Sequence, residues 1–285
     1  MTSPLPKPMI DDLVNRALRE DLGDAGDITT NATIPATAII SGTIRARKPG
    51  WIAGTDIAIS TFAHIDPSIS VDVKTKDGTK AAKDDPIITV RGSARAILTA
   101  ERVALNFVGH LSGIATATAT LVSETKGTIA KISCTRKTTP GLRAIEKYAV
   151  QCGGGHNHRF GLYDAVMIKD NHIAAVGDVK GAIDAARRNV GHMVKIEVEI
   201  DRLDQLAQAL TGGADVILLD NMPPEILRKA VQQTGGRAIL EASGNVTQQT
   251  VRAIAETGVD VISSGWITHS APTLDLGLDF DEQPS

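Results

Sequence analysis

One pattern repeats along the chain after Gly127, and it constrains the fold more than any other feature of the sequence. Short apolar, β-branched runs alternate with stretches of helical periodicity, and the last three steps between runs are about 22 residues each. That is the period of a βα unit in a parallel barrel. The runs are IAKISCT at 129–135, AVMIKDN at 165–171, KIEVEI at 195–200, DVILLDN at 215–221, RAILEASG at 237–244 and DVISSG at 260–265.

These runs predict an α/β protein with six recognisable parallel strands. The stretches between them have helical patterns at 179–188, 203–210, 225–233 and 247–257. A standard barrel has eight strands. Either one or two strands are therefore hidden near 139–160, or the barrel is incomplete.

The first half of the chain has a different pattern, which predicts a small sheet with helices. Apolar residues within 10–22 recur at i, i+3 and i+4, as in a helix that packs against a core. Between 38 and 90, short β-like runs are separated by turn signals such as Lys48-Pro49-Gly50. A helix is predicted around 55–65 within this region, and a long helix from about 96 to 124.

Composition excludes several classes of protein. With 42% hydrophobic and 3% aromatic residues, the 285-residue chain can bury a core made of Ala, Val, Ile and Leu, so it is not disordered. Its apolar runs are interrupted before about 18 residues, so no membrane span is expected. The N-terminus has no signal-peptide pattern. Cys134 and Cys152 are expected to be reduced thiols in the cytoplasm, and a net charge of −3 argues against a general nucleic-acid binder.

The region 131–172 is basic in an otherwise acidic protein. It contains seven Lys or Arg against three acids, a local charge of +4, and three histidines. Such a window fits a site for a small polyanion, because guanidinium and ammonium groups bind carboxylates and phosphates. A solvated basic face is the alternative explanation.

Polar or glycine residues stand at the end of every predicted strand of the second half. In parallel β/α folds the ligand lies at the carboxyl ends of the strands, so these residues are candidates for one site. In chain order they are Arg136 and Lys137, Lys169, Glu199, Asp220, Ser243 and Gly244, and Gly265.

Each residue type suits a different part of an anionic ligand. The turns Ser243-Gly244 and Ser264-Gly265 can let backbone N–H groups approach a phosphate, as on the last strands of many barrels. Glu199 and Asp220 can bind ribose hydroxyls or Mg²⁺. An ion pair with Lys169 is the structural alternative for these two carboxylates.

The stretch Gly153-Gly-Gly-His-Asn-His-Arg159 is the most unusual in the sequence. Three consecutive glycines disfavour regular structure and indicate a tight backbone path that presents His158 and Arg159. A zinc site with Cys152 is disfavoured, because the spacing C-x3-H-x-H matches no standard arrangement and Arg159 would repel the ion.

Taken together, the motifs closely resemble the quinolinate phosphoribosyltransferase family, and the resemblance covers nearly the whole chain. It is carried by residues 100–106, 109–114, 134–143, 146–150, 153–159, 168–172, 197–199, 218–221, 241–245, 268–270 and 274–279.

The resemblance implies two domains and a reaction. An N-terminal α/β sandwich is expected over 1–115, with the tail 268–285 a candidate to pack back on it, and an open β/α barrel of fewer than eight strands over 116–267. The reaction would join quinolinate to phosphoribosyl pyrophosphate, giving nicotinate mononucleotide, pyrophosphate and CO₂ in NAD biosynthesis. Mg²⁺ would accompany the ribosyl donor, and the enzyme would be a cytoplasmic homodimer with shared active sites.

The resemblance also assigns roles residue by residue. It implies that Arg136, His158, Arg159 and Lys169 bind quinolinate, with Lys137 beside them. Arg102 would reach the site of the neighbouring subunit. Glu199 and Asp220 would lie near the ribose hydroxyls and the metal, while Ser243, Gly244 and Gly265 would form the phosphate-binding turns. In the catalytic group we include Lys137, Lys169, Glu199 and Asp220; Cys134 and His156 receive no role.

Two other functions remain open from the residues. A barrel lyase could use Lys169 as a Schiff-base nucleophile. A non-catalytic anion-binding homologue, such as the molybdenum-transport-associated relatives of this family, would have the same basic pocket without the transfer reaction.

Overall fold

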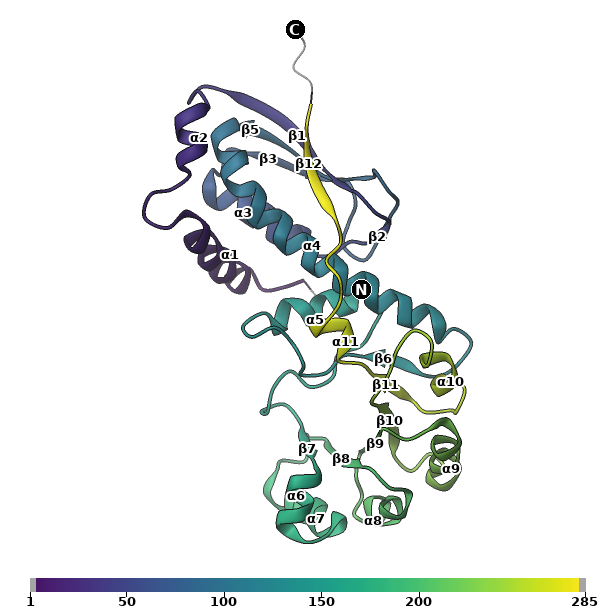
Figure 1. Cartoon of the computed structure of the whole chain (residues 1–285). Helices are drawn as coiled ribbons and strands as arrows, with labels where there is room; N and C mark the ends of the chain where they lie inside the picture. Colours follow the sequence, from purple (N-terminus) through teal and green to yellow (C-terminus); the bar gives the residue numbers. More distant parts are fainter. Residues whose placement is uncertain (1–3, 282–285) are drawn as a thin grey trace. The chain divides into compact units, whose positions relative to one another are not determined.

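A parallel sheet of six strands organises residues 118–144 and 155–270, one of two units in a computed structural model that describes residues 4–281 (Figure 1). All its pairings are parallel, and the strand order is β6-β11-β10-β9-β8-β7. The strands are β6 (Lys131–Ser133), β7 (Val166–Ile168), β8 (Ile196–Ile200), β9 (Val216–Asp220), β10 (Ile239–Ser243) and β11 (Val261–Ser263).

The sheet is open, because its edge strands β6 and β7 do not pair with each other. The region 139–160, where one or two more strands were a possibility, instead contains helix α5 (Arg143–Cys152). After α5, the only sheet-like contact recorded for this region is an isolated parallel bridge between Ser133 and His156. The α/β class and an open barrel of fewer than eight strands are therefore confirmed.

Helices follow the strands, as the alternating pattern predicts. They are α6 (Asp170–Val176), α7 (Val179–Asn189), the 3₁₀ turn η1 (Leu203–Gln205), α8 (Leu206–Thr211), α9 (Pro224–Thr234), α10 (Val251–Ala255) and α11 (Trp266–His269). Helix α9 begins with Pro224 in its first turn and ends at the left-handed Gly235, the usual sequence signals for both ends.

Helix α10 is shorter than the pattern at 247–257 predicts. The backbone N–H of Thr247 donates to Thr250 Oγ1 over 2.9 Å, and the backbone N–H of Thr250 donates to Thr247 Oγ1 over 3.3 Å. Such side-chain bonds give the backbone an alternative to helical pairing. The segment between β10 and α10 is therefore a loop.

The other unit contains residues up to 117, residues 145–154 and residues from 271 onward. It holds an antiparallel sheet in the order β12-β1-β5-β3 and a small β2-β4 ladder. Its elements are α1 (Lys7–Leu22), α2 (Ile28–Thr33), β1 (Ile39–Ala46), β2 (Gly50–Trp51), α3 (Thr55–Ile65), β3 (Ser70–Val73), β4 (Lys80–Ala81), β5 (Pro86–Ser93), most of α4 (Ala94–Glu124), and β12 (Leu276–Phe280).

The sheet of this unit is covered by helices on one face (Figure 1). Ile44 of β1, Phe62 of α3 and Ile97 of α4 are fully buried in one hydrophobic cluster, which supplies most of the driving force for this layer. Strand β12 belongs to the tail of the chain and pairs antiparallel with β1, with Leu278 opposite Ile44. The segment 145–154, which falls within the range expected for the barrel domain, groups with this unit instead.

Helix α4 is long and apolar enough, by length and composition alone, to cross a membrane, although the uninterrupted apolar runs in the sequence are short. Two thirds of its most apolar window (67%) is buried in the protein, as in a helix that packs in a core. Close packing is visible at Gly113, where an added Cβ would lie 2.3 Å from the carbonyl oxygen of Pro272.

Candidate active site

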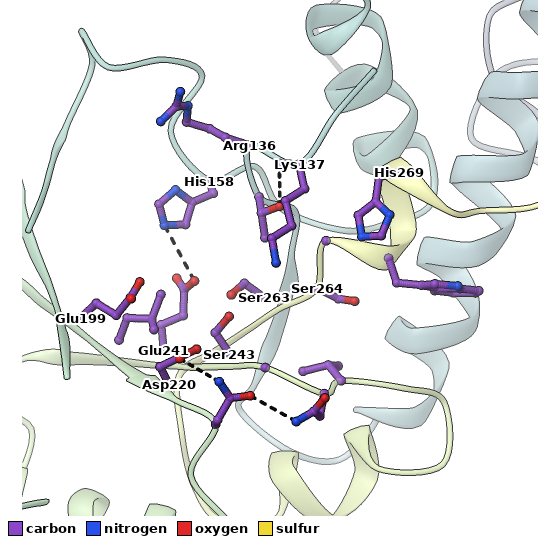
Figure 2. A pocket seen from close by; sticks show the side chains of 18 of the residues that line it. Arg136, Lys137, His158, Glu199, Asp220, Glu241, Ser243, Ser263, Ser264 and His269 are labelled. Atoms are coloured by element: carbon purple, nitrogen blue, oxygen red, sulfur yellow. Dashed lines mark hydrogen bonds and ion pairs between the residues drawn. The ribbon is translucent and has the colours of Figure 1, made fainter. Parts of the chain in front are cut away.

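The strand order decides which strand ends are neighbours. Going along the sheet from β7 to β6, the residues at the carboxyl ends are Lys169, Glu199, Asp220, then the Ser243-Gly244 turn, the Ser264-Gly265 turn, and finally Arg136 and Lys137. They surround a cavity of about 1050 Å³, large enough for a nucleotide-sized ligand. Cations therefore stand at both ends of the sheet, with carboxylates and small residues between them. Figure 2 shows the part of this set that includes Arg136, Lys137, Glu199, Asp220 and Ser243.

A smaller recess of about 380 Å³ opens among the cations. It shares Arg136, Arg159 and Lys169 with the main cavity and is also lined by apolar side chains, among them Tyr163 and Val194. A recess with several cations and apolar walls suits a flat ring that carries carboxylates.

The segment after the three glycines lies beside β6, and this explains how the unusual motif presents its side chains. The backbone N–H of His156 donates to the Ile132 carbonyl over 2.8 Å, and that of Cys134 donates to the His156 carbonyl over 3.1 Å. Cys134 Sγ donates to Asn157 Oδ1 over 3.3 Å. Held in this way along the edge strand, the motif directs His158 and Arg159 to the cavity.

Both ring nitrogens of His158 have partners. Nε2 lies 2.9 Å from Glu197 Oε2 and 3.7 Å from Glu241 Oε1, while Nδ1 accepts a hydrogen bond from the backbone N–H of Arg159 over 2.8 Å. Since Nδ1 accepts, the ring proton of a neutral imidazole is on Nε2 and points to the carboxylates. Glu197 and Glu241 therefore orient the ring.

Glu241 lies under the cavity and is almost completely buried. Burial, together with the neighbouring Glu197 carboxylate, holds the pKa of Glu241 well above its usual range. Within residues 4–281, the buried Oε1 atoms of both glutamates and Oγ of Ser263 accept no hydrogen bond, although Glu241 Oε1 keeps its 3.7 Å contact with His158. With His158, the two glutamates form a group with the composition and spacing of a cation site.

Arg159 is held by its own backbone neighbours and keeps free donor capacity. One terminal nitrogen donates to the Ala165 carbonyl over 3.0 Å, but the buried Nε has no hydrogen-bond partner among the described residues. Burial and the nearby Arg136 guanidinium lower the pKa of Arg159. An arriving anion would satisfy Nε and offset the repulsion between the two guanidinium groups.

The loops that carry these cations are tied together by Arg143. Its Nε donates to Thr138 Oγ1 over 2.9 Å, and a terminal nitrogen donates to the Phe160 carbonyl over 3.0 Å. Arg143 thus connects the loop after β6 to the loop after His158.

The two predicted carboxylates have different partners. Glu199 forms a close ion pair with Lys169, the alternative role that the sequence left open for it. Asp220 instead accepts a hydrogen bond from Asn221 Nδ2 over 2.7 Å. Both carboxylates line the cavity, and such oxygen ligands are the kind that Mg²⁺ prefers.

The two Ser-Gly turns have no room for a larger residue. Gly244 has a φ of 95°, and a Cβ there would lie 2.1 Å from Asn221 Oδ1. At Gly265 a Cβ would lie 2.8 Å from Lys137 Cδ. Lys137 is adjacent to this turn because β6 pairs with β11, and its carbonyl accepts a hydrogen bond from Thr268 Oγ1 over 2.7 Å.

The structure brings ten of the eleven site residues predicted from the sequence to this one cavity. They are Arg136, Lys137, His158, Arg159, Lys169, Glu199, Asp220, Ser243, Gly244 and Gly265. The eleventh, Arg102, is an exposed residue of α4 in the other unit and does not line the cavity. Cys152, the cysteine of the disfavoured zinc set, is not among the described residues that line the cavity.

Sequence reasoning missed several residues of the site, among them Glu197, Glu241 and Asn221. A signal for the two glutamates was available. Alternate residues of a strand point to the same face, so Glu197 shares a face with Glu199, and Glu241 with Ser243. For Asn221 no local pattern distinguished a structural turn from a cavity residue.

Comparison with known proteins identifies two family models on this chain. Residues 27–112 match the N-terminal domain of quinolinate phosphoribosyl transferase, and residues 114–279 match its C-terminal domain.

Relatives are similar over nearly their whole length. The chain is 46% identical to the nicotinate-nucleotide pyrophosphorylase (carboxylating) of Mycobacterium leprae, covering 94% of this chain and 96% of that protein. It is 41% identical to the chloroplastic enzyme of that name from Arabidopsis thaliana, covering 95% of this chain and 82% of the relative. The crystal structure of NadC from Streptococcus pyogenes superposes with a TM-score of 0.93 at 41% identity, covering 98% of this chain and 100% of the other.

Proposed function

Because the chain belongs to the quinolinate phosphoribosyltransferase family, we propose that the cavity at the carboxyl ends of the six strands is its active site. The enzyme transfers a phosphoribosyl group to quinolinate with loss of CO₂, giving nicotinate mononucleotide for NAD biosynthesis. The observation that carries the proposal is the order of charges around the cavity, with cations at both ends and carboxylates and Ser-Gly turns between them.

Quinolinate would bind among the cations. Its two carboxylates match Arg136, Arg159 and Lys169, which also line the smaller recess. The unpartnered Nε of Arg159 supports this assignment, because a bound carboxylate would satisfy it. His158 would contact the ring or a carboxylate from a position fixed by Glu197 and Glu241.

The ribosyl donor would occupy the other side of the cavity. Backbone N–H groups of the turns at Ser243-Gly244 and Gly265 would meet the ribose 5′-phosphate, and Lys137, adjacent to Gly265, would add a positive charge. Glu199 and Asp220 would bind the ribose hydroxyls.

Mg²⁺ is proposed as the companion of the donor. Glu199 and Asp220 fit it, since they are hard carboxylate ligands on neighbouring strands that line the cavity. When bound, the ion would neutralise charge on the pyrophosphate group.

Positioning and electrostatics suffice for the transfer itself. The lone pair of the quinolinate nitrogen forms a bond to C1 of the ribose, while the bond from C1 to pyrophosphate breaks and its electron pair leaves with the pyrophosphate oxygen. The developing charge resembles an oxocarbenium ion, so no protein nucleophile is needed. The resulting pyridinium nitrogen then stabilises the electron pair that remains on the adjacent carbon when CO₂ leaves, until that carbon takes a proton.

We also propose a homodimer in which Arg102 of each subunit reaches the other subunit's cavity. Arg102 is exposed on α4, so its guanidinium is available to a partner. We further propose the cytoplasm as the location of the protein, although a plant relative is named chloroplastic.

One assay tests the proposed function. The purified protein, given quinolinate, phosphoribosyl pyrophosphate and Mg²⁺, should release pyrophosphate and CO₂ in equal amounts. No release would favour a non-catalytic anion-binding protein. Borohydride trapping of a carbonyl substrate on Lys169 would favour a lyase. That role needs an uncharged amine, whereas Lys169 forms an ion pair with Glu199.

A further inference from the structure

Asn221 and Asn245 have an unusual backbone conformation at the rim of the cavity. Their φ angles are 53° and 52°, and the only other non-glycine residue with positive φ in the described part of the chain is Asp84. Asn221 directly follows β9, and Asn245 comes two residues after β10. Asparagine adopts positive φ more readily than most residues with side chains, and non-glycine residues in this conformation cluster at functional sites.

Their side chains connect two parts of the cavity. Asn221 Nδ2 donates to Asp220 Oδ2 over 2.7 Å, and Asn221 Oδ1 accepts from Asn245 Nδ2 over 3.2 Å (Figure 2, dashed lines leading from Asp220). Because a carboxylate only accepts hydrogen bonds, the orientation of the Asn221 amide is fixed. The backbone carbonyl of Asn245 in turn accepts a hydrogen bond from Thr250 Oγ1 over 3.1 Å.

The backbone reinforces this connection. The Asn221 N–H donates to the Ser243 carbonyl over 2.8 Å. The Asn221 amide also occupies the space over Gly244, where a Cβ would lie 2.1 Å from Asn221 Oδ1. One end of the amide therefore contacts a carboxylate of β9, and the other contacts the turn after β10.

We propose that Asn221 is a positioning residue that fixes Asp220 and the turn at Ser243–Asn245 relative to each other, so that ribose hydroxyls and 5′-phosphate are bound together. The inference rests on the proposed function, which assigns those two groups to Asp220 and to the turn. A ligand that carries both groups depends on this alignment, whereas quinolinate carries neither.

The same arrangement predicts an effect on binding rather than on folding. Asn221 and Asn245 are exposed in the folded protein. Water can therefore replace their mutual hydrogen bond, and the bond contributes little to the free energy of unfolding. A residue that only stabilised the fold would change the melting temperature, and would not separate the affinity for nucleotide from the affinity for quinolinate.

The test compares Asn221→Gly with wild type. Glycine accepts positive φ, so this variant removes the amide with little backbone strain. We expect nicotinate mononucleotide binding, measured by calorimetry, and KM for phosphoribosyl pyrophosphate each to worsen about tenfold, while the Kd of quinolinate stays within about twofold. Asn189→Gly is the matched control: Asn189 Nδ2 donates to the Ala185 carbonyl over 2.8 Å on α7, outside the cavity.

A double-variant cycle tests whether the two asparagines act through their shared bond. Asn245→Gly should weaken nucleotide binding less than Asn221→Gly, and the double variant should lose no more than Asn221→Gly alone. Additive losses, or wild-type nucleotide binding by Asn221→Gly, would overturn the proposal.

A second variant keeps the test decisive if Asn221→Gly does not fold. Asn221→Asp still accepts from Asn245 but cannot donate to Asp220, so it should weaken nucleotide binding at least as much; unchanged binding refutes the inference. A wild-type protein that releases no pyrophosphate refutes the proposed function itself, whereas an active wild type with unaffected variants refutes only the role of Asn221.

Discussion

Glu197 fixes the imidazole of His158, with its Oε2 2.9 Å from Nε2 of the ring. The other ring nitrogen accepts from the backbone N–H of Arg159. A side chain held at both nitrogens has one orientation, and a binding site benefits from such preorganisation because less freedom is lost when the ligand arrives.

This relationship predicts how Glu197 variants behave. Glu197→Ala removes the acceptor for Nε2 and should raise KM for quinolinate about tenfold, with a much smaller change in KM for the ribosyl donor. Glu197→Gln keeps an acceptor oxygen and should retain most of the affinity. Glu225→Ala, in the exposed first turn of α9, serves as the control. Equal losses for both substrates in Glu197→Ala would contradict a specific effect on His158.

The cluster of Arg136, Arg159 and Lys169 predicts selectivity for a dicarboxylate. Nicotinate has one carboxylate and would leave one of these exposed or partly exposed cations without its ligand contact, which should cost about 1.5 to 3 kcal/mol of transition-state binding, the range for a hydrogen bond to a charged group. Quinolinate should react with stoichiometric release of CO₂, and nicotinate should be a poor substrate. Comparable kcat/KM for the two acids would show that the cations do not bind both carboxylates of quinolinate.

In the proposed phosphate-binding turns, adding a larger side chain at Gly265 should weaken nucleotide binding more than removing the hydroxyl of Ser243. In Gly265→Val the new Cβ would lie within 3.0 Å of the Lys137 side chain, so the variant both fills the turn and displaces a cation. It should bind nicotinate mononucleotide far more weakly, whereas Ser243→Ala should lose about 1.5 to 3 kcal/mol, the range for a hydrogen bond to a charged group.

Calorimetry measures both variants, and circular dichroism checks that they are folded. Quinolinate binding to the free enzyme should change little in either variant, because quinolinate carries no phosphate. If a folded Gly265→Val protein bound the nucleotide like wild type, the phosphate would have to bind elsewhere.

The proposed dimer can be tested by subunit exchange. Arg102→Ala and Lys137→Ala should each be nearly inactive, because in either homodimer every site carries one lesion. A mixed dimer contains one site with neither lesion, so mixing and reassembling the two variants should restore about a quarter of wild-type activity if subunits pair at random and equally. Demonstrated exchange without recovered activity would count against a shared site.

Asp215 should make a pH-dependent contribution to the free energy of unfolding. Burial alone would raise its pKa, but hydrogen bonds from Lys195, Arg187 and the backbone N–H of Ile196 outweigh burial and hold the pKa of Asp215 at about 2. Because this lies below the unfolded value of 3.8, the carboxylate stabilises the fold above about pH 4, and this contribution is lost as the pH falls toward 2.

The corresponding variant is Asp215→Asn. At pH 7 it should lower the melting temperature by about 2–4 °C, equivalent to about 1 kcal/mol for a group partly screened by solvent. The difference from wild type should shrink as the pH falls below 4. Asp12→Asn, which breaks an exposed ion pair with Arg16 on α1, should show almost no difference at either pH. If the difference in melting temperature between Asp215→Asn and wild type were the same at pH 2.5 as at pH 7, an effect of the Asp215 charge would be excluded.

Much of this site is predictable because its residues follow strands. A strand end is visible as the point where an apolar β-branched run stops, and in a parallel sheet all such ends lie on one edge. Lys169, Glu199, Asp220 and Ser243 could therefore be assigned to one cavity from local patterns alone. The same reasoning missed Glu241, which lies inside β10: strand alternation puts it on the same face as Ser243, but its contact with His158 joins residues far apart in the chain.

The sequence by itself determined the local elements: the period of the βα units, the long helix α4, and the chemical character of each strand end. Only the tertiary structure decided that β6 pairs with β11 and leaves β7 at the far edge, that the region 139–160 forms α5 rather than strands, and that His158 meets Glu197 and Glu241. Periodicity depends on neighbours a few residues apart, whereas strand pairing and buried polar contacts join residues far apart in the chain. Strand pairings and buried polar contacts form only when the folded core buries apolar side chains and supplies hydrogen-bond partners for the buried polar groups.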